Sequence, residues 1–275
     1  MICCERRKFK VKATKLDPET HRAAAAILDQ ASANQSVVPL FSVAHHEMSI
    51  ADGYAIQRCW AELRIQRGER LVGYKVGFTS HAMQKAYKVE KPLSGRLFDS
   101  MVWGTGAQLS ARRFFKLHVE VELAFIMGSD LASQSVTIAD VLSATVFVQP
   151  ALELIDYRTV TPRSIADMVA DNTSCAGAVL GGRPVRPSQL NLGWVGATLA
   201  KNGNIVETGV SAAVLGHPAR ALVALSEQLA SEGEWIKAGD IILSGAFMPM
   251  VDVISGDTIQ ADFGDLGTID LSVTQ

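Results

Sequence analysis

Apolar and polar residues alternate most regularly over residues 118–125, which read His-Val-Glu-Val-Glu-Leu-Ala-Phe. A period of two is typical of a β-strand, whose side chains point to opposite faces in turn. Glu120 and Glu122 therefore share one predicted face, while the apolar residues between them face a core. Two neighbouring carboxylates on a half-buried strand repel each other and lose hydration, so a fold keeps them where a cation lies between them. A solvated strand face with two unrelated glutamates explains the spacing equally well.

The pattern predicts helices and strands elsewhere along the chain. Ser49 can cap the helix that begins there, and Gly68 follows as its stop. Asn202-Gly203 is a strong hairpin-turn signal between two strands. The predicted helices cover 16–33, 49–67, 79–84, 138–145 and 218–231, and the predicted strands cover 71–78, 118–127, 178–180, 195–202, 203–208, 240–243 and 258–263.

The order of these elements predicts the domain organisation. Helices come early and strands late, which indicates an α+β fold with a mostly β C-terminal body. We expect residues 1–15 to form a disordered tail, residues 16–70 an N-terminal helical segment, and residues 71–275 one functional unit. The sequence has no internal repeat and no low-complexity linker.

Composition narrows the class of protein. The 275 residues are 48% apolar, and 26 basic against 28 acidic side chains give a net charge of −2. This balance gives no reason to expect binding to nucleic acid or to an anionic membrane, and no apolar run is long enough to span a bilayer. The N-terminus lacks the apolar stretch of a secretory signal, and the four cysteines show no paired spacing. We therefore expect a reduced, cytoplasmic protein.

A third carboxylate near the glutamate pair would favour a metal site. The run 150–158 offers two candidates, Glu153 between apolar residues and Asp156, which precedes Arg158 and can simply pair with it. Carboxylate ligands without histidine or cysteine suit Mg²⁺ or Mn²⁺ rather than zinc. Three protein ligands leave positions for water or for a chelating substrate. The residues alone do not choose between Glu153 and Asp156.

Other polar residues are candidates with ordinary alternatives. Lys75 lies in a Gly-x-Lys-x-Gly strand, where it can bind a carboxylate or move a proton, or can extend to solvent as a surface lysine. The polar run 171–175 and the turn Ser244-Gly245 can line a site or form ordinary loops. Cys175 is better explained as a small packed residue than as a nucleophile. No nucleophile elbow and no phosphate-binding glycine loop is present.

Five segments in order resemble a known family. They are 73–80 (GYKVGFTS), 119–124 (VEVELA), 150–156 (PALELID), 170–175 (ADNTSC) and 242–245 (ILSG). Together they resemble the fumarylacetoacetate hydrolase superfamily, and within it the branch of 2-oxopent-4-enoate hydratases and 4-oxalocrotonate decarboxylases of aromatic meta-cleavage catabolism. The likeness runs from about residue 47 to the C-terminus.

The resemblance implies a fold and a site. The fold is a mixed β-roll with N-terminal helices, in homo-oligomers built from dimers that can associate with a related pathway enzyme. The implied Mg²⁺ or Mn²⁺ ligands are Glu120, Glu122 and Glu153, which selects Glu153 over Asp156. Lys75 matches the active-site lysine. The remaining implied site residues are Asp171, expected to be catalytic, and Ser174, Ser244 and Gly245, expected to line the substrate pocket.

The resemblance also implies a reaction, which is hydration of a 2-oxo-alkenoate through its 2-hydroxy-2,4-dienoate form. Hydratases of this branch carry Pro-Asp-(Phe/Tyr)-Gly after the lysine, but this chain reads Pro-Leu-Ser-Gly with Leu93. Leu93 cannot move a proton, which favours the alternative, a 2-oxo-hex-3-enedioate decarboxylase. Arg96 beside it either binds a second substrate carboxylate or lies on the surface. Carbon–carbon bond hydrolysis ranks third because the sequence indicates no His–acid dyad, and an inactive partner subunit is the non-enzymatic alternative.

Overall fold

The computed structural model describes residues 13–133 and 135–275. The tail predicted over residues 1–15 therefore lies almost entirely outside the described residues. Seven α-helices are described in this part of the chain. They are α1 (Pro18–Asn34), α2 (Phe41–Ala44), α3 (Ile50–Gln66), α4 (His81–Tyr87), α5 (Ile138–Ala144), α6 (Ile165–Ala170) and α7 (Ala219–Ser231). None of the described helices has the length and apolar character needed to cross a membrane.

Capping explains how the first long helices begin and how they stay together. Ser49 caps α3 as predicted, in a reciprocal capping box with Asp52. The buried Asp52 carboxylate also accepts hydrogen bonds from the Leu16 backbone N–H and, at 2.9 Å, from His21 Nε2 of α1. One carboxylate therefore both starts α3 and holds α1 against it.

The strands form two mixed sheets. In spatial order, the larger sheet contains β2 (Leu93–Phe98), β1 (Leu71–Gly77), β10 (Ile241–Leu243), β5 (His118–Met127), β6 (Thr145–Ile155), β7 (Cys175–Leu180) and β3 (Val102–Gly104), with β11 (Val251–Asp252) paired to β5. The smaller sheet contains β4 (Ala107–Ser110), β13 (Thr268–Thr274), β12 (Thr258–Asp262), β8 (Gly196–Lys201) and β9 (Asn204–Val210). This arrangement confirms the α+β prediction.

Two local features show where turn residues and proline predict the strand boundaries correctly and where they do not. Asn202 and Gly203 both have positive φ, as the predicted hairpin turn between β8 and β9 requires. Pro150 lies inside β6, although proline usually argues against a central strand. The strand accommodates it because Pro150 still accepts a hydrogen bond from the Gly181 N–H while lacking a donor of its own.

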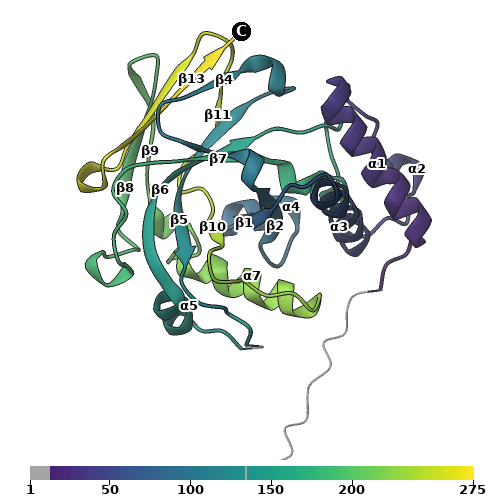
Figure 1. The fold of residues 1–275 in the computed structure, drawn as a ribbon, viewed down its shortest axis with the longest axis horizontal. Helices are drawn as coiled ribbons and strands as arrows, with labels where there is room; N and C mark the ends of the chain where they lie inside the picture. Colours follow the sequence, from purple (N-terminus) through teal and green to yellow (C-terminus); the bar gives the residue numbers. More distant parts are fainter. Residues whose placement is uncertain (1–12, 134) are drawn as a thin grey trace, which may run out of the picture.

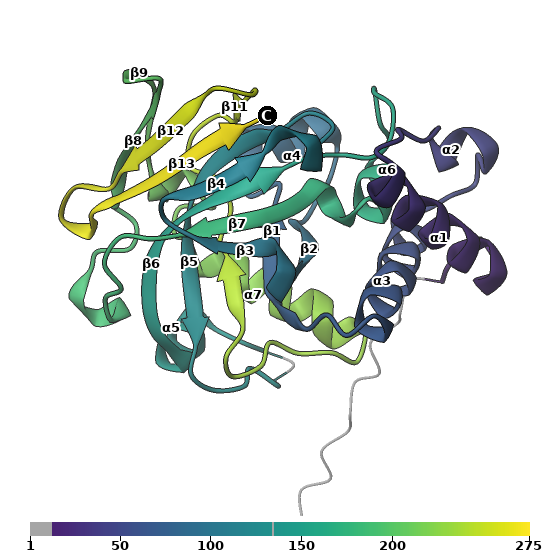
Figure 2. The same cartoon turned by 45° about the horizontal axis from the view of Figure 1, so that its top comes forward.

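The two faces of the larger sheet pack against different partners. Val121 and Leu123 of β5 are buried in a core shared with the smaller sheet and with Leu222 of α7. On the opposite face, small residues of β5 and β6 (Ala124 and Ala151) pack with residues of α1 and α3. Figures 1 and 2 show α1, α2 and α3 gathered on one side of the molecule, with the smaller sheet on the other. The face that carries Glu120 and Glu122 is thus the face that the N-terminal helices cover.

Candidate functional site

Three glutamates meet on the helix-covered face of the larger sheet. The antiparallel register of β5 and β6 places Glu120 directly opposite Glu153, and Glu122 lies two residues further along the same face. One carboxylate oxygen from each of the three lies within 4.8 Å of the others. Glu122 and Glu153 are completely buried, whereas Glu120 is partly exposed. The site therefore opens at its Glu120 end.

Within residues 13–133 and 135–275, the cluster has one cationic neighbour and too few hydrogen-bond donors. Lys75 Nζ lies 3.1 Å from Glu153 Oε1, and the Gly245 backbone N–H donates to Glu122 Oε2 at 2.7 Å. Glu122 Oε1 and Glu153 Oε2 are buried without any hydrogen-bond donor among the described residues. Three carboxylates and one ammonium leave two negative charges in excess, and buried charge of this kind is strongly unfavourable unless it is neutralised.

The titration behaviour of the cluster has the same cause. Burial, followed by repulsion from Glu153, raises the pKa of Glu120 from 4.5 to about 7. The same two effects raise the pKa of Glu122 well above its usual range. Burial opposes the charge on Lys75, but attraction to Glu153 and the other glutamates outweighs it and raises the pKa of the lysine. A divalent cation fits this oxygen-only donor set, because it neutralises the excess charge and satisfies the orphaned oxygens.

The glycines around Lys75 have separate structural reasons. A Cβ on Gly73 would lie 1.9 Å from the Ile241 carbonyl oxygen, so glycine lets β10 pair closely with β1. A Cβ on Gly77 would lie 3.3 Å from Lys75 Nζ and 3.6 Å from Thr173 Cγ2. Gly77 therefore leaves room beside the ammonium group. The surface-lysine alternative is wrong, because Lys75 is only 3% exposed.

The turn after β10 contacts the cluster directly. Gly245 has a φ of +103°, and a Cβ there would lie 2.2 Å from Thr79 Oγ1, so only glycine brings its N–H onto Glu122 without strain. The preceding Ser244 is fully buried, and its hydroxyl has no hydrogen-bond partner among the described residues. The structure therefore brings the Gly245 N–H to the glutamates, and the substrate contact expected of Ser244 stays a prediction.

Asp171 and Ser174 lie in the segment between α6 and β7. The Asp171 carboxylate accepts from the Arg158 backbone N–H at 2.7 Å and from Arg158 Nε at 2.5 Å. This ion pair orders the segment, and the catalytic role expected for Asp171 stays a prediction. Residues 172–174 all have positive φ, between 49° and 62°. Such strain costs roughly 1–3 kcal/mol per residue and is typical of functional segments. Ser174 is 8% exposed, and its substrate contact stays a prediction.

Arg96 is not brought to the glutamates. It pairs across the sheet with Tyr74, which points to the face opposite Lys75. Its guanidinium donates to both carboxylate oxygens of Glu234, at 2.8 and 2.9 Å. Arg96 is only 6% exposed, so the surface-arginine alternative is wrong as well. The structure provides no geometry for the substrate contact that was expected of Arg96.

The structure also contains a His–acid dyad that the sequence analysis did not indicate. His118 Nε2 lies 2.7 Å from Asp252 Oδ1, because β11 pairs with the start of β5. His118 shares the face of Glu120, and its ring stacks on Tyr157 at 5.8 Å. Burial lowers the pKa of His118, which favours its neutral form. The signal available in the sequence was the position of His118 two residues before Glu120.

Two further candidates have structural explanations. The Asp156 carboxylate accepts from the backbone N–H groups of Phe115 and Lys116, both at 2.8 Å, so it is committed to a turn. Glu153 is thus the third member of the cluster, as the resemblance implied. Cys175 is buried, and burial raises the pKa of its thiol well above the usual range. It is a packed residue, as expected, and has no thiolate character.

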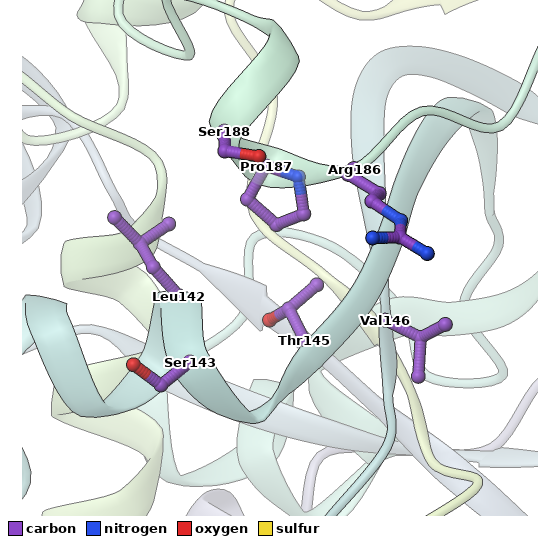
Figure 3. Close-up of a pocket in the computed structure, with 7 residues that line it drawn as sticks. All are labelled: Leu142, Ser143, Thr145, Val146, Arg186, Pro187 and Ser188. Atoms are coloured by element: carbon purple, nitrogen blue, oxygen red, sulfur yellow. The ribbon is translucent and has the colours of Figure 1, made fainter.

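One surface hollow lies away from the glutamates. It has a volume of about 500 Å³ and is lined by residues of α5, the start of β6 and the loop before β8 (Figure 3). Thr145 in its wall and Glu153 stand at opposite ends of β6, separated by about 25 Å of strand. Arg186 is the one charged side chain that lines it. We therefore take the glutamate cluster, and not this hollow, as the candidate functional site.

The fold and the carboxylate site together define a class of metal-binding α+β protein. Residues 70–274 match the sequence model of the family described as Fumarylacetoacetate (FAA) hydrolase C-terminal, and the chain belongs to this family. Its relatives place it in the branch of 2-keto-4-pentenoate hydratases and 4-oxalocrotonate decarboxylases. The α+β roll with N-terminal helices that the resemblance implied is confirmed.

The chain is similar to several members over almost its full length. It is 41% identical over 260 residues to a 2-oxo-hept-4-ene-1,7-dioate hydratase of Escherichia coli, covering 92% of this chain and 97% of the relative. It is 36% identical over 255 residues to a 2-keto-4-pentenoate hydratase of Paraburkholderia xenovorans strain LB400, covering 92% and 95%. Among solved structures, 4-oxalocrotonate decarboxylase from Pseudomonas putida G7, complexed with magnesium and adipate, superposes with a TM-score of 0.93 at 30% identity, covering 95% of this chain and 100% of that one.

Proposed function

We propose that this protein is a metal-dependent hydratase that adds water to a 2-oxo-alkenoate, presented as its 2-hydroxy-2,4-dienoate form, in aromatic meta-cleavage catabolism. The observation that carries the proposal is the buried cluster of Glu120, Glu122 and Glu153 beside Lys75. The extended similarity to two hydratases supports the reaction class. The ion we propose is Mg²⁺, with Mn²⁺ as the alternative, because the donors are all carboxylate oxygens.

The three glutamates would hold the cation, since one oxygen of each lies within 4.8 Å of the others and buried oxygens of Glu122 and Glu153 lack hydrogen-bond donors among the described residues. When bound, the cation supplies Lewis-acid stabilisation of negative charge that develops on the substrate's C2 oxygen. Three protein ligands leave space for the carboxylate and the C2 oxygen of the substrate to approach. The buried Ser244 hydroxyl would then donate a hydrogen bond to a substrate oxygen, because no acceptor or donor among the described residues engages it.

Lys75 is the proton-handling group in this proposal. Its ammonium lies 3.1 Å from Glu153, from where it can stabilise the dienolate or deliver a proton along the conjugated chain. Gly77 leaves the space beside Lys75 Nζ that a substrate needs. The N-terminal helices exclude water from this face of the sheet, which strengthens each of these electrostatic interactions.

Leu93 favours one alternative function, a 2-oxo-hex-3-enedioate decarboxylase. Leu93 stands opposite Gly77 in the β1–β2 pair, close to Lys75 along the strand. It is 6% exposed and packs with Val89 and Val169, so it contributes an apolar wall where an acidic group was expected of a hydratase. Both reactions proceed through the same dienolate, and the decarboxylase forms it by losing CO₂.

The purified protein with Mg²⁺ separates these functions. We would incubate it with 2-hydroxypenta-2,4-dienoate, 2-hydroxyhepta-2,4-dienedioate and 2-oxo-hex-3-enedioate, and measure both hydrated product and CO₂. Hydrated product without CO₂ supports the hydratase, whereas CO₂ without hydrated product overturns it. An acylpyruvate added to the panel tests carbon–carbon hydrolysis by the His118–Asp252 dyad, and absence of every activity supports the inactive partner subunit.

The assembly and location remain predictions. We expect a homo-oligomer built from dimers, which can associate with a related pathway enzyme, in the cytoplasm. Light scattering after size-exclusion chromatography measures the oligomer, and a molar mass equal to one 29.5 kDa chain contradicts it.

A further inference from the structure

An arginine with a largely buried side chain lies over Tyr157 without a full set of partners among the described residues. The Arg163 side chain is 9% exposed, and its Nη1 has no hydrogen-bond acceptor among the described residues. Its nearest carboxylate oxygen, on Asp171, is 3.7 Å away. That carboxylate is already engaged by Arg158. Burial lowers the pKa of Arg163, as expected for a charge that is incompletely compensated.

Two contacts between side chains connect this arginine to the face of β5 that carries the cluster. Glu120 is the partly exposed member of the cluster, and His118 is the next residue towards the opening on the same face of β5. His118 stacks on Tyr157, which follows β6 beyond Glu153. The Arg163 guanidinium in turn lies over the Tyr157 ring, 4.2 Å from its centroid. Arg163 is therefore linked to the cluster through a continuous wall of side chains.

The size of this wall suits a substrate with two carboxylates. Glu120 and His118 are two strand residues apart, which corresponds to about 7 Å and is comparable to an extended seven-carbon chain. A substrate whose first carboxylate lies at the glutamates therefore extends as far as His118, whose ring stacks on the Tyr157 ring that Arg163 covers. The guanidinium of arginine matches a carboxylate with two parallel hydrogen bonds.

We propose that Arg163, held against Tyr157, binds the far carboxylate of the substrate and so selects 2-oxo-alkenedioates over 2-oxo-alkenoates with a single carboxylate. This inference rests on the proposed function and names the substrate class of the same site. The other buried cations are committed elsewhere. Arg96 lies on the opposite face with Glu234, and Arg158 holds Asp171.

The test compares two substrates in one variant. We would measure kcat/KM for 2-hydroxyhepta-2,4-dienedioate and for 2-hydroxypenta-2,4-dienoate in the wild type and in Arg163→Gln. The expected result is a roughly 10- to 100-fold fall in the ratio of the two values, mostly through the KM of the dicarboxylate, because a charged hydrogen-bonding partner is removed. Arg163→Lys should restore part of the ratio. The matched control Arg112→Gln removes an exposed arginine and should leave the ratio unchanged.

A binding experiment keeps this proposal separate from the reaction. Calorimetry of the Mg²⁺-loaded protein with adipate and with hexanoate should show tighter binding of adipate in the wild type, and loss of that preference in Arg163→Gln. Equal effects on both ligands, or no effect, would overturn the assignment of Arg163, since a merely structural role does not distinguish them. A wild type that binds adipate preferentially but hydrates neither dienoate would overturn the hydratase proposal and leave Arg163 as the carboxylate anchor. If Arg163→Gln does not fold, the same comparison of adipate and hexanoate is made with Arg163→Lys, which should lose part of the preference for adipate.

Discussion

Replacing Glu122 by glutamine should change stability in opposite directions with and without metal. Glu122→Gln keeps the size of the side chain and keeps an oxygen to accept the Gly245 N–H at 2.7 Å. It removes one of three negative charges from a cluster that has a single lysine in contact. Without metal, the variant should therefore be more stable than the wild type. With metal, it should lose most of the stabilisation that the ion provides.

The magnitudes follow from the buried charges. Raising the pKa of Glu120 from 4.5 to about 7 means that its ionised form costs the metal-free folded state on the order of 3 kcal/mol. Since the folded-state pKa of this carboxyl is raised, the metal-free protein has its full stability below about pH 4.5, where the carboxyl is protonated. It loses these roughly 3 kcal/mol as the pH rises through about 7. The ionised form of Glu122 carries a cost of the same sign, because burial, Glu153 and Glu120 raise its pKa, and Glu122→Gln removes that cost. Metal at about 100 times its Kd adds about 2.7 kcal/mol, and a ligand loss that weakens binding about 100-fold reduces this gain to about 0.4 kcal/mol.

Thermal unfolding at pH 5 and pH 8, with and without Mg²⁺, measures both effects, and calorimetry measures the metal Kd. Glu62→Gln is the matched control, because Glu62 is exposed on α3 and lies outside the cluster. It should change neither the pH dependence nor the response to Mg²⁺. An unchanged Kd in Glu122→Gln would refute the metal assignment. A loss of stability in the metal-free variant at pH 8 would refute the argument from charge repulsion.

Three further changes test other parts of the site and fold. Lys75→Met should lower kcat on the order of 100-fold or more in the dienoate assay while calorimetry shows Mg²⁺ binding retained, because a proton-handling group is removed and the carboxylates remain. Gly245→Ala should lower the free energy of unfolding by roughly 1–3 kcal/mol in a denaturant titration, since its Cβ would lie 2.2 Å from Thr79 Oγ1 at a φ of +103°. Asp52→Asn should cost roughly 2–3 kcal/mol at neutral pH, because Asp52 holds His21 and several backbone N–H groups. Its hydrogen bonds lower the pKa of Asp52 despite burial, so its contribution to stability is present above pH 3.8 and shrinks as the pH falls below that value. The same difference in free energy of unfolding between variant and wild type at neutral and at low pH would contradict this.

Local patterns predicted the elements that position the site, because their causes are local. Alternation in residues 118–127 gives β5 and puts two glutamates on one face. The Ser49 cap and Gly68 give the ends of α3, and Asn202-Gly203 gives the β8–β9 turn. The internal proline of β6 hid that strand, since the loss of one donor is tolerated only in a context that the sequence does not display.

Long-range register was the part that residues alone did not predict. Glu153 rather than Asp156 joins the cluster because β6 pairs with β5 in one register, and only the family resemblance indicated that choice. Asp252 reaches His118 through pairing of a two-residue strand, which has no pattern of its own. Arg96 was expected near the substrate from its place in the chain, but strand alternation turns it to the other face. Each of these outcomes depends on pairing between distant segments.

The helices that cover the glutamate-bearing face have a consequence for how such proteins diverge. The match to the family model begins at residue 70, whereas α1 and α3, which precede it, pack on small sheet residues such as Ala124 and Ala151. These helices exclude water from the face of the sheet that carries the carboxylates, although none of the three glutamates belongs to a helix. A lineage that exchanged its helical segment would inherit identical ligands in a different dielectric, with altered metal affinity and acid strength. A substitution in the helical segment can therefore change the chemistry of the sheet without changing any ligand.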